Sequence, residues 1–143
     1  MDTELDLGRA RAAVDAALAA AAAQNKRISV AVVDHRGHDV LVVRGDGAAW
    51  FTTGVARAKA ATTALMGVAS GNLAGLRADY PELLELIAAQ TAQPVTTLPG
   101  GIPVRAEGTV VGAVGVSGAS PDEDAAYAEA GVAALRSAGQ SMS

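Results

Sequence analysis

The sequence predicts an α+β domain in which a five-stranded antiparallel sheet is flanked by helices. Three observations favour this class. Two strand-like segments follow one another near the N-terminus, three more lie near the C-terminus, and helical segments separate the two groups. This order lacks the regular strand–helix alternation of a parallel sheet. With 143 residues, the chain is long enough to bury one substantial core, so we expect a single domain over residues 1–143.

The first helix is expected over residues 7–25. Apolar residues such as Val14 recur there at helical spacing, and Thr3 and Asp6 form a capping-box pair at the start. The alanine run at residues 19–23 consists of the strongest helix former, so we interpret it as helix and not as linker.

A β-hairpin is expected next. Residues 28–34 (ISVAVVD) are β-branched and almost entirely apolar, which is typical of a strand buried on both faces. The segment HRGHD supplies a turn around Gly37, and residues 40–44 (VLVVR) form the return strand.

Three helical segments are expected in the middle of the chain, over residues 52–66, 71–77 and 81–91. The last of these begins with Pro81, which suits the first position of a helix.

Three further strands and a helix complete the prediction. The strands are residues 94–98 (PVTTL), 102–106 (IPVRA) and 109–117 (TVVGAVGVS). The closing helix has Ser120 as N-cap and Glu123 at the capping-box position. We therefore interpret the acidic residues 122–124 as complements to the helix dipole and predict no metal site there.

Composition limits the function. Hydrophobic residues make up 50% of the chain and charged residues 18%, so we expect an exposed apolar patch and a homo-oligomer. The net charge of −4 argues against a nucleic-acid partner. The chain has no cysteine, which excludes a disulfide or a thiolate nucleophile. No apolar run is long enough to span a bilayer and no secretory signal is evident, so we expect a cytoplasmic protein without a membrane partner.

A glycine-rich stretch, residues 98–118, is the first candidate for a binding site. Two successive glycines in Pro99-Gly100-Gly101 free the backbone to aim N–H groups at one point, and such a nest binds anions. One face of the last strand carries Val111, Ala113, Gly115 and Ser117. Because this face is small, a helix or a ligand can lie close to it.

Lys59 is the most suggestive charged residue. It lies at the edge of the apolar stripe of its helix, and its helical neighbours Ala56, Ala60 and Thr63 are small. A long cation in such surroundings can reach along a crevice; the alternative is an ordinary surface lysine. If Lys59 lines such a crevice, we expect Lys59→Ala to leave folding intact, because alanine is the better helix former and the change removes no core volume.

Other polar and aromatic residues leave alternatives open. Arg44 and Asp46 form either a structural pair or a binding pair at the mouth of a pocket. His35 and His38 flank the hairpin turn and either ligate a metal or serve as polar turn residues. For the adjacent Trp50-Phe51 pair, packing in the core or in an interface is the default.

Several motifs together resemble a known family. They are ISVAVVDHRGH, VRGDGA, the helix around Lys59-Ala60, LPGGIPV and VVGAVGVSGASPDED followed by an alanine-rich helix. In these the chain is similar to the HbpS/GlcG family of haem-degrading-like domains, which also forms the C-terminal domain of PduO-type adenosyltransferases. The resemblance implies a five-stranded antiparallel sheet flanked by helices, similar to profilin or PAS domains, and symmetric oligomers.

The resemblance also implies one crevice, between the Lys59 helix and the Pro-Gly-Gly loop. The positions that match the family pattern and would surround it are Asp34, Gly37, Arg44, Asp46, Gly47, Lys59, Pro99, Gly100, Gly101 and Gly118. Haem or a corrinoid is the cofactor that the resemblance suggests, with Arg44 and Lys59 placed to bind propionates or the carboxylate of a smaller acid.

Three functions remain open. The first is a small-ligand-binding protein for haem or a related tetrapyrrole. The second is a cofactor-independent enzyme, of the kind used in natural-product biosynthesis, for a small carboxylate-bearing or enolisable metabolite. In this enzyme the Pro99–Gly101 backbone would be the oxyanion donor, Lys59 and Arg44 electrostatic partners, and Asp46 a base. The third is a non-catalytic oligomeric partner subunit.

Overall fold

The computed structural model describes residues 5–142 of the chain. The first helix, α1 (Leu7–Ala22), begins after Asp6, whose carboxylate accepts a hydrogen bond from the Arg9 N–H at 2.8 Å. Residues 1–4 and 143 of the predicted single domain lie outside the described residues. Thr3, the expected capping partner of Asp6, is one of them.

The sheet consists of β1 (Ser29–Asp34), β2 (Asp39–Arg44), β3 (Gly101–Ala106) and β4 (Thr109–Ser117), in the order β2-β1-β4-β3. All neighbouring strands are antiparallel. β4 is central and pairs with β1 in unbroken register from Ser29↔Ser117 to Asp34↔Gly112. This arrangement places the first hairpin and the last hairpin side by side, although residues 45–100 separate them in the chain.

The predicted number of strands is wrong, because residues 94–98 do not join the sheet. Their backbone is bonded by side chains instead of by a neighbouring strand. The Thr96 N–H donates to Thr62 Oγ1 at 3.1 Å, and the Leu98 N–H donates to Thr96 Oγ1 at 3.2 Å. The α+β class and the antiparallel pairing are confirmed, with four strands in the described part of the chain.

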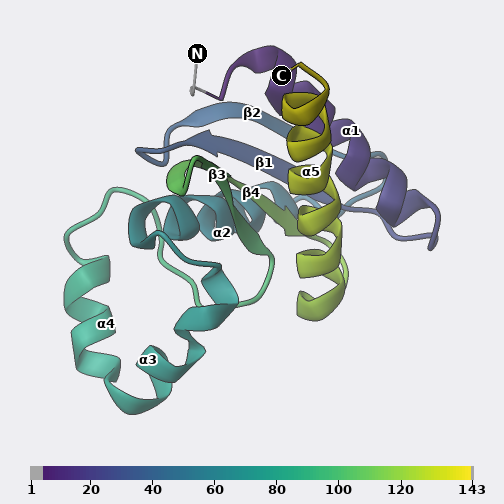
Figure 1. Cartoon of the computed structure of the whole chain (residues 1–143). Coiled ribbons are helices and arrows are strands. Elements are labelled where there is room, and N and C mark those ends of the chain that lie inside the picture. The colour runs from purple at the N-terminus through teal and green to yellow at the C-terminus, as the bar shows by residue number, and fades with distance from the viewer. Residues whose placement is uncertain (1–4, 143) are drawn as a thin grey trace.

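The helices cover the sheet on two faces (Figure 1). α1 and α5 (Pro121–Met142) pack on one face, over a core that includes Val30, Val32, Val114 and Val116. α2 (Thr52–Met66) lies on the other face, against Ala31, Val33 and Ala113. None of the helices in the described residues is long and apolar enough to cross a membrane.

The close contact between α2 and β4 depends on Gly115. A Cβ atom added there would lie 2.2 Å from the Ala56 carbonyl oxygen and 2.7 Å from the Ala60 nitrogen. The small face of this strand is therefore filled by a helix, which was one of the two alternatives that the sequence left open.

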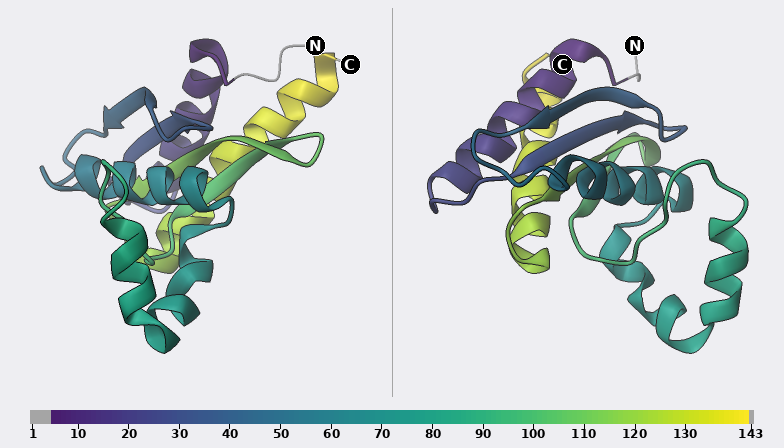
Figure 2. Two further views of the ribbon diagram at one scale, coloured as in Figure 1. Left: turned by 90° about the vertical axis from the view of Figure 1, so that its left-hand side faces the viewer. Right: turned by 180° about the vertical axis from the view of Figure 1, so that it is seen from behind.

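An arm projects from the sheet body (Figures 1 and 2). It consists of a 3₁₀ helix, η1 (Ser70–Leu73), followed by α3 (Ala74–Asp79) and α4 (Pro81–Ala88). Neither α3 nor α4 has a buried residue. The apolar side chains of α4, such as Leu83 and Leu86, are exposed to solvent in the single chain.

Candidate functional site

Lys59 lies in the middle of α2, and its side chain is only 2% exposed. The ammonium group donates one hydrogen bond to the carbonyl of Val116 at 2.9 Å and another to Oδ2 of Asp124 at 3.0 Å. Lys59 thus reaches along the inside of the fold, which excludes the alternative of an ordinary surface lysine. Its charge is already satisfied by groups of the chain itself, because Asp124 is also 2% exposed.

Asp124 is the residue that sequence reasoning missed. It is in the first turn of α5, where it was interpreted as part of an acidic helix cap. Its Oδ1 accepts a hydrogen bond from the Ala119 N–H at 2.9 Å, while its other oxygen faces Lys59. Burial raises the pKa of the Asp124 carboxyl, because desolvation outweighs the hydrogen bond from Ala119 and the attraction of Lys59. No local signal links the two residues, which are 65 positions apart.

Glu123 fulfils the cap that the sequence predicted. The Ser120 N–H donates to its carboxylate at 3.1 Å, and the Glu123 N–H donates to Ser120 Oγ at 3.2 Å. These two bonds form a capping box. The hydrogen bond from the Ser120 backbone is the main reason that the pKa of Glu123 is lowered.

The Pro99-Gly100-Gly101 turn packs directly against Lys59. A Cβ atom on Gly100 would lie 2.7 Å from Lys59 Cδ, and one on Gly101 would lie 2.3 Å from the Lys59 carbonyl oxygen. The Gly101 N–H donates to Ser70 Oγ at 2.9 Å. The predicted crevice is therefore filled by the chain's own atoms, which explains why two glycines stand in this turn: the backbone approaches α2 too closely for any side chain.

The remaining predicted site residues lie elsewhere. Asp34 and Arg44 are at opposite ends of the β1–β2 hairpin, because Arg44 is paired with Ser29 at the start of β1. The Asp34 carboxylate organises the turn by accepting hydrogen bonds from the N–H groups of Arg36 and His38, at 2.9 and 3.0 Å. The structure brings Lys59 together with Pro99, Gly100 and Gly101, and separates Asp34 from Arg44.

The two histidines of the hairpin turn are both exposed. Among the described residues, no group of three or more histidine, aspartate or glutamate side chains is placed to hold a metal ion. His35 and His38 therefore have the surroundings of polar turn residues.

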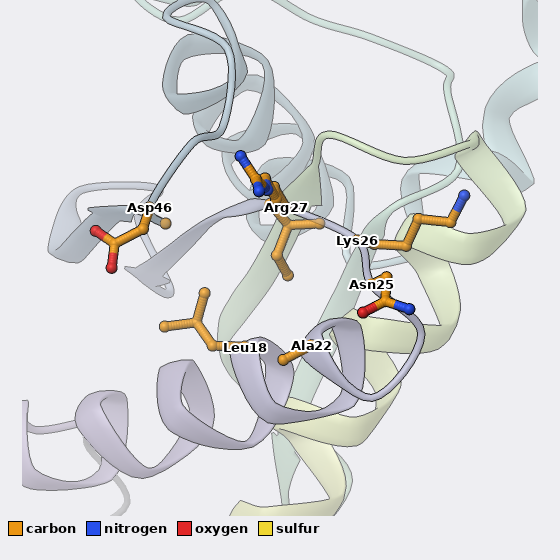
Figure 3. Close-up of a pocket in the computed structure, with 8 residues that line it drawn as sticks. Leu18, Ala22, Asn25, Lys26, Arg27 and Asp46 are labelled. Atoms are coloured by element: carbon orange, nitrogen blue, oxygen red, sulfur yellow. The ribbon is translucent and has the colours of Figure 1, made fainter.

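Asp46 lines a hollow next to α1, shown in Figure 3. The hollow has a volume of about 410 Å³ and an apolar floor that includes Leu18, Ala22 and Ile28. Arg44 and Asp46 do not form an ion pair in the described chain, so they are not the structural pair considered above.

The aromatic residues lie mostly on the surface. Trp50 is 79% exposed and Phe51 52%, and their rings meet edge to face at 88° with centroids 5.8 Å apart. Tyr80, on the arm, is also exposed, whereas Tyr127 is buried and donates a hydrogen bond to Gln24. Core packing, one of the expected alternatives for Trp50 and Phe51, does not occur in the single chain.

These features define a small α+β domain with a tightly closed interior and an exposed aromatic and aliphatic surface. The chain belongs to the HbpS-like family: the family model for the haem degrading protein HbpS-like matches residues 5–133. This agrees with the resemblance found in the sequence motifs.

Known relatives are similar to the chain in sequence and in structure. The protein GlcG of Escherichia coli strain K12 is 36% identical over 97 residues, which cover 65% of this chain and 66% of GlcG. The crystal structure of a double mutant of Streptomyces reticuli HbpS has a TM-score of 0.84 and 38% identity, and the match covers 94% of this chain and 89% of that one. The crystal structure of a PduOC:Heme complex has a TM-score of 0.82 and 25% identity, with 92% and 95% covered.

The residues present fit haem on the surface better than in the interior. The Pro99–Gly101 turn fills the space next to Lys59, and the buried side chains of the described residues include no histidine or methionine to serve as an axial ligand. Exposed aromatic side chains (Trp50, Phe51) and exposed arginines (Arg27, Arg44) are instead the kinds of group that contact a planar ring and pair with carboxylates.

Proposed function

We propose that this protein binds haem or a related tetrapyrrole on its surface. Membership of the HbpS-like family is the observation that carries the proposal, together with the structural similarity to a domain solved as a haem complex. Both relatives of known structure superpose over more than nine tenths of this chain, so the proposal draws on the whole domain and not on one motif.

The distribution of aromatic residues supports a surface site. Of the four aromatic residues in the chain, Trp50, Phe51 and Tyr80 are more than half exposed. Large apolar side chains in water are costly, at about 25 cal/mol per Å² of apolar area. A flat apolar ligand that covers such side chains would recover part of this free energy.

The enzyme alternative has less support. Two of its proposed groups are already engaged, because the Lys59 ammonium contacts Asp124 and the Gly101 N–H donates to Ser70. A substrate would have to displace buried partners before these groups could act on it. Catalytic roles for Lys59, Arg44 and Asp46 stay predictions of the sequence.

We also propose that the protein forms a homo-oligomer, in which contacts between subunits cover part of the exposed apolar surface of the arm, including α4. Light scattering at micromolar concentration should give a mass that is a multiple of 14.2 kDa. A monomer under these conditions would contradict the proposal.

Titration with haemin tests the proposed function. The purified protein should develop a saturable Soret change with a defined stoichiometry per chain. Replacing His35→Ala and His38→Ala together should cause at most a partial loss, because both histidines are exposed on a turn. If the wild type shows no saturable change, the proposal is wrong.

A further inference from the structure

At one corner of the molecule, the loop after β2 leads into α2. Trp50 and Phe51 stand there as a pair of exposed rings. An indole that is 79% exposed offers an open ring face to the solvent. Perpendicular aromatic pairs of this kind normally form part of a core or an interface, so a pair in water calls for a partner.

Arg44 is on the same side of the sheet as this pair. It is the cross-strand partner of Ser29, and cross-strand partners share a face. Ser29 Oγ is hydrogen-bonded at 2.7 Å to Oγ1 of Thr52, the residue that follows Phe51. The next pair on the same face, Ala31 and Val42, packs with the α2 residues Ala56 and Ala60, so this face of the sheet is the one that α2 covers.

Arg27 supplies a second cation next to the same loop. Gly47 has a left-handed backbone with φ +78°, and a Cβ atom on it would lie 2.4 Å from Arg27 Nη1 and 2.8 Å from Arg27 Cδ. The arginine side chain therefore lies on Gly47, three residues before Trp50. Figure 3 shows its guanidinium turned away from α1, on the far side of the hollow from Leu18.

Both guanidinium groups are available for a ligand. Within residues 5–142, the ion pairs involve Lys26, Arg57, Lys59 and Arg136, and neither Arg27 nor Arg44 has a hydrogen-bond or ion-pair partner. The acidic residue of this loop, Asp46, lines the same hollow as Arg27, but the two form no ion pair within residues 5–142. The loop thus combines two unpaired cations with an open aromatic face.

We propose that Trp50, Phe51, Arg27 and Arg44 form the surface that binds the tetrapyrrole, a step that rests on the proposed function. Because the two rings are perpendicular, the macrocycle stacks on one of them, the more exposed Trp50 indole, with Phe51 beside it, and its two propionates pair with the two guanidinium groups. The histidines of the hairpin turn are at the opposite end of β1 and β2 from this corner, so the ring is held by stacking and charge and not through its iron.

The test compares haemin with iron-free protoporphyrin IX, by absorbance and porphyrin fluorescence. Both should bind the wild type with dissociation constants within about threefold of each other, because the iron is not the main contact. Trp50→Ala should weaken both ligands about tenfold, the scale of one lost aromatic contact, and Trp50→Phe should restore much of the affinity. Arg27→Gln and Arg44→Gln should each weaken binding several-fold at low salt and less at high salt.

Two control variants remove comparable groups elsewhere. Tyr80→Ala removes another exposed ring, and Arg36→Gln removes an exposed arginine at the opposite hairpin end. Both should bind within about twofold of the wild type. Circular dichroism should show that all these surface variants remain folded.

The failures are distinguishable. A wild type that binds neither ligand overturns the proposed function and this site with it. A wild type that binds haemin while Trp50→Ala binds equally well overturns only the site. The site is also wrong if Tyr80→Ala loses as much affinity as Trp50→Ala, or if protoporphyrin IX fails to bind where haemin binds.

Discussion

Replacing Lys59 by methionine should destabilise the fold strongly. The substitution keeps a long unbranched side chain but removes the charge that faces Asp124 at 3.0 Å. Asp124, which is 2% exposed, keeps only the hydrogen bond from the Ala119 N–H, and the Val116 carbonyl loses a donor. The expectation that Lys59→Ala leaves folding intact depended on a lysine that lines an open crevice and fills no core volume. The burial of this side chain and its pair with Asp124 reverse that expectation.

The size of the effect follows from the burial of both partners. Removing one member of a buried ion pair costs about 3–5 kcal/mol, because it leaves a charge without compensation. The whole stability of a domain is about 5–15 kcal/mol, so the variant loses a large fraction of it. At a few degrees per kcal/mol, we expect the melting temperature to fall by roughly 10–15 °C.

Urea unfolding of four proteins measures this effect: wild type, Lys59→Met, Asp124→Asn and the double variant. The double variant should be less destabilised than the sum of the single variants, since it leaves no unpaired charge. Lys26→Met is the matched control, because Lys26 is 42% exposed and its pair with Glu123 is 3.7 Å long. We expect a change of about 0.5 kcal/mol or less for this control.

The pH dependence provides a second check. In Lys59→Met the Asp124 carboxyl is buried without its cation, so its folded pKa lies still further above the ordinary value of 3.8. The stability that the protonated carboxyl contributes is complete below 3.8 and is lost as the pH rises through the folded pKa. The variant should therefore fall further behind the wild type as the pH rises. An unfolding midpoint and slope equal to those of the wild type at neutral pH would refute the buried ion pair.

Three other predictions test the packing around the same region. Gly101→Ala should destabilise the protein by about several kcal/mol, because its Cβ would lie 2.3 Å from the Lys59 carbonyl oxygen. Gly54→Ala is the control: it has open space around it in α2 and should stabilise the protein by about 0.5–1 kcal/mol in thermal unfolding. Thr63→Val should raise the melting temperature, because the Thr63 hydroxyl is buried without a hydrogen-bond partner. Thr62→Val should lower the melting temperature, because it removes the acceptor for the Thr96 N–H. Equal changes for the two variants would contradict this account. The pKa of Glu123 is lowered from 4.5, so the stability that its carboxylate contributes is present above 4.5 and is lost as the pH falls through the folded pKa. The difference in melting temperature between wild type and Glu123→Gln should therefore shrink in acid. A difference that stays constant with pH would exclude the charged cap.

The sequence by itself determined the features that depend on neighbouring residues. Residues 52–66 and 109–117 were predicted as a helix and a strand with the bounds that the structure has. The capping box of Ser120 and Glu123 was also predicted, because its two hydrogen bonds join residues three positions apart. In such cases the residues that form the contact stand together in the sequence, and local spacing is enough to identify them.

Only the tertiary structure decided where partners come from distant segments. The β-branched segment 94–98 has the composition of a strand, but Thr62 on α2 supplies a hydrogen bond that a neighbouring strand would otherwise have made. Lys59 is recognisable as unusual, yet its partner Asp124 resembles an ordinary cap residue. The two meet only because β4 packs against α2 and leads directly into α5. The exposure of Trp50 and Phe51 is decided in the same way, because burial of a side chain depends on which elements pack over it and not on its immediate neighbours.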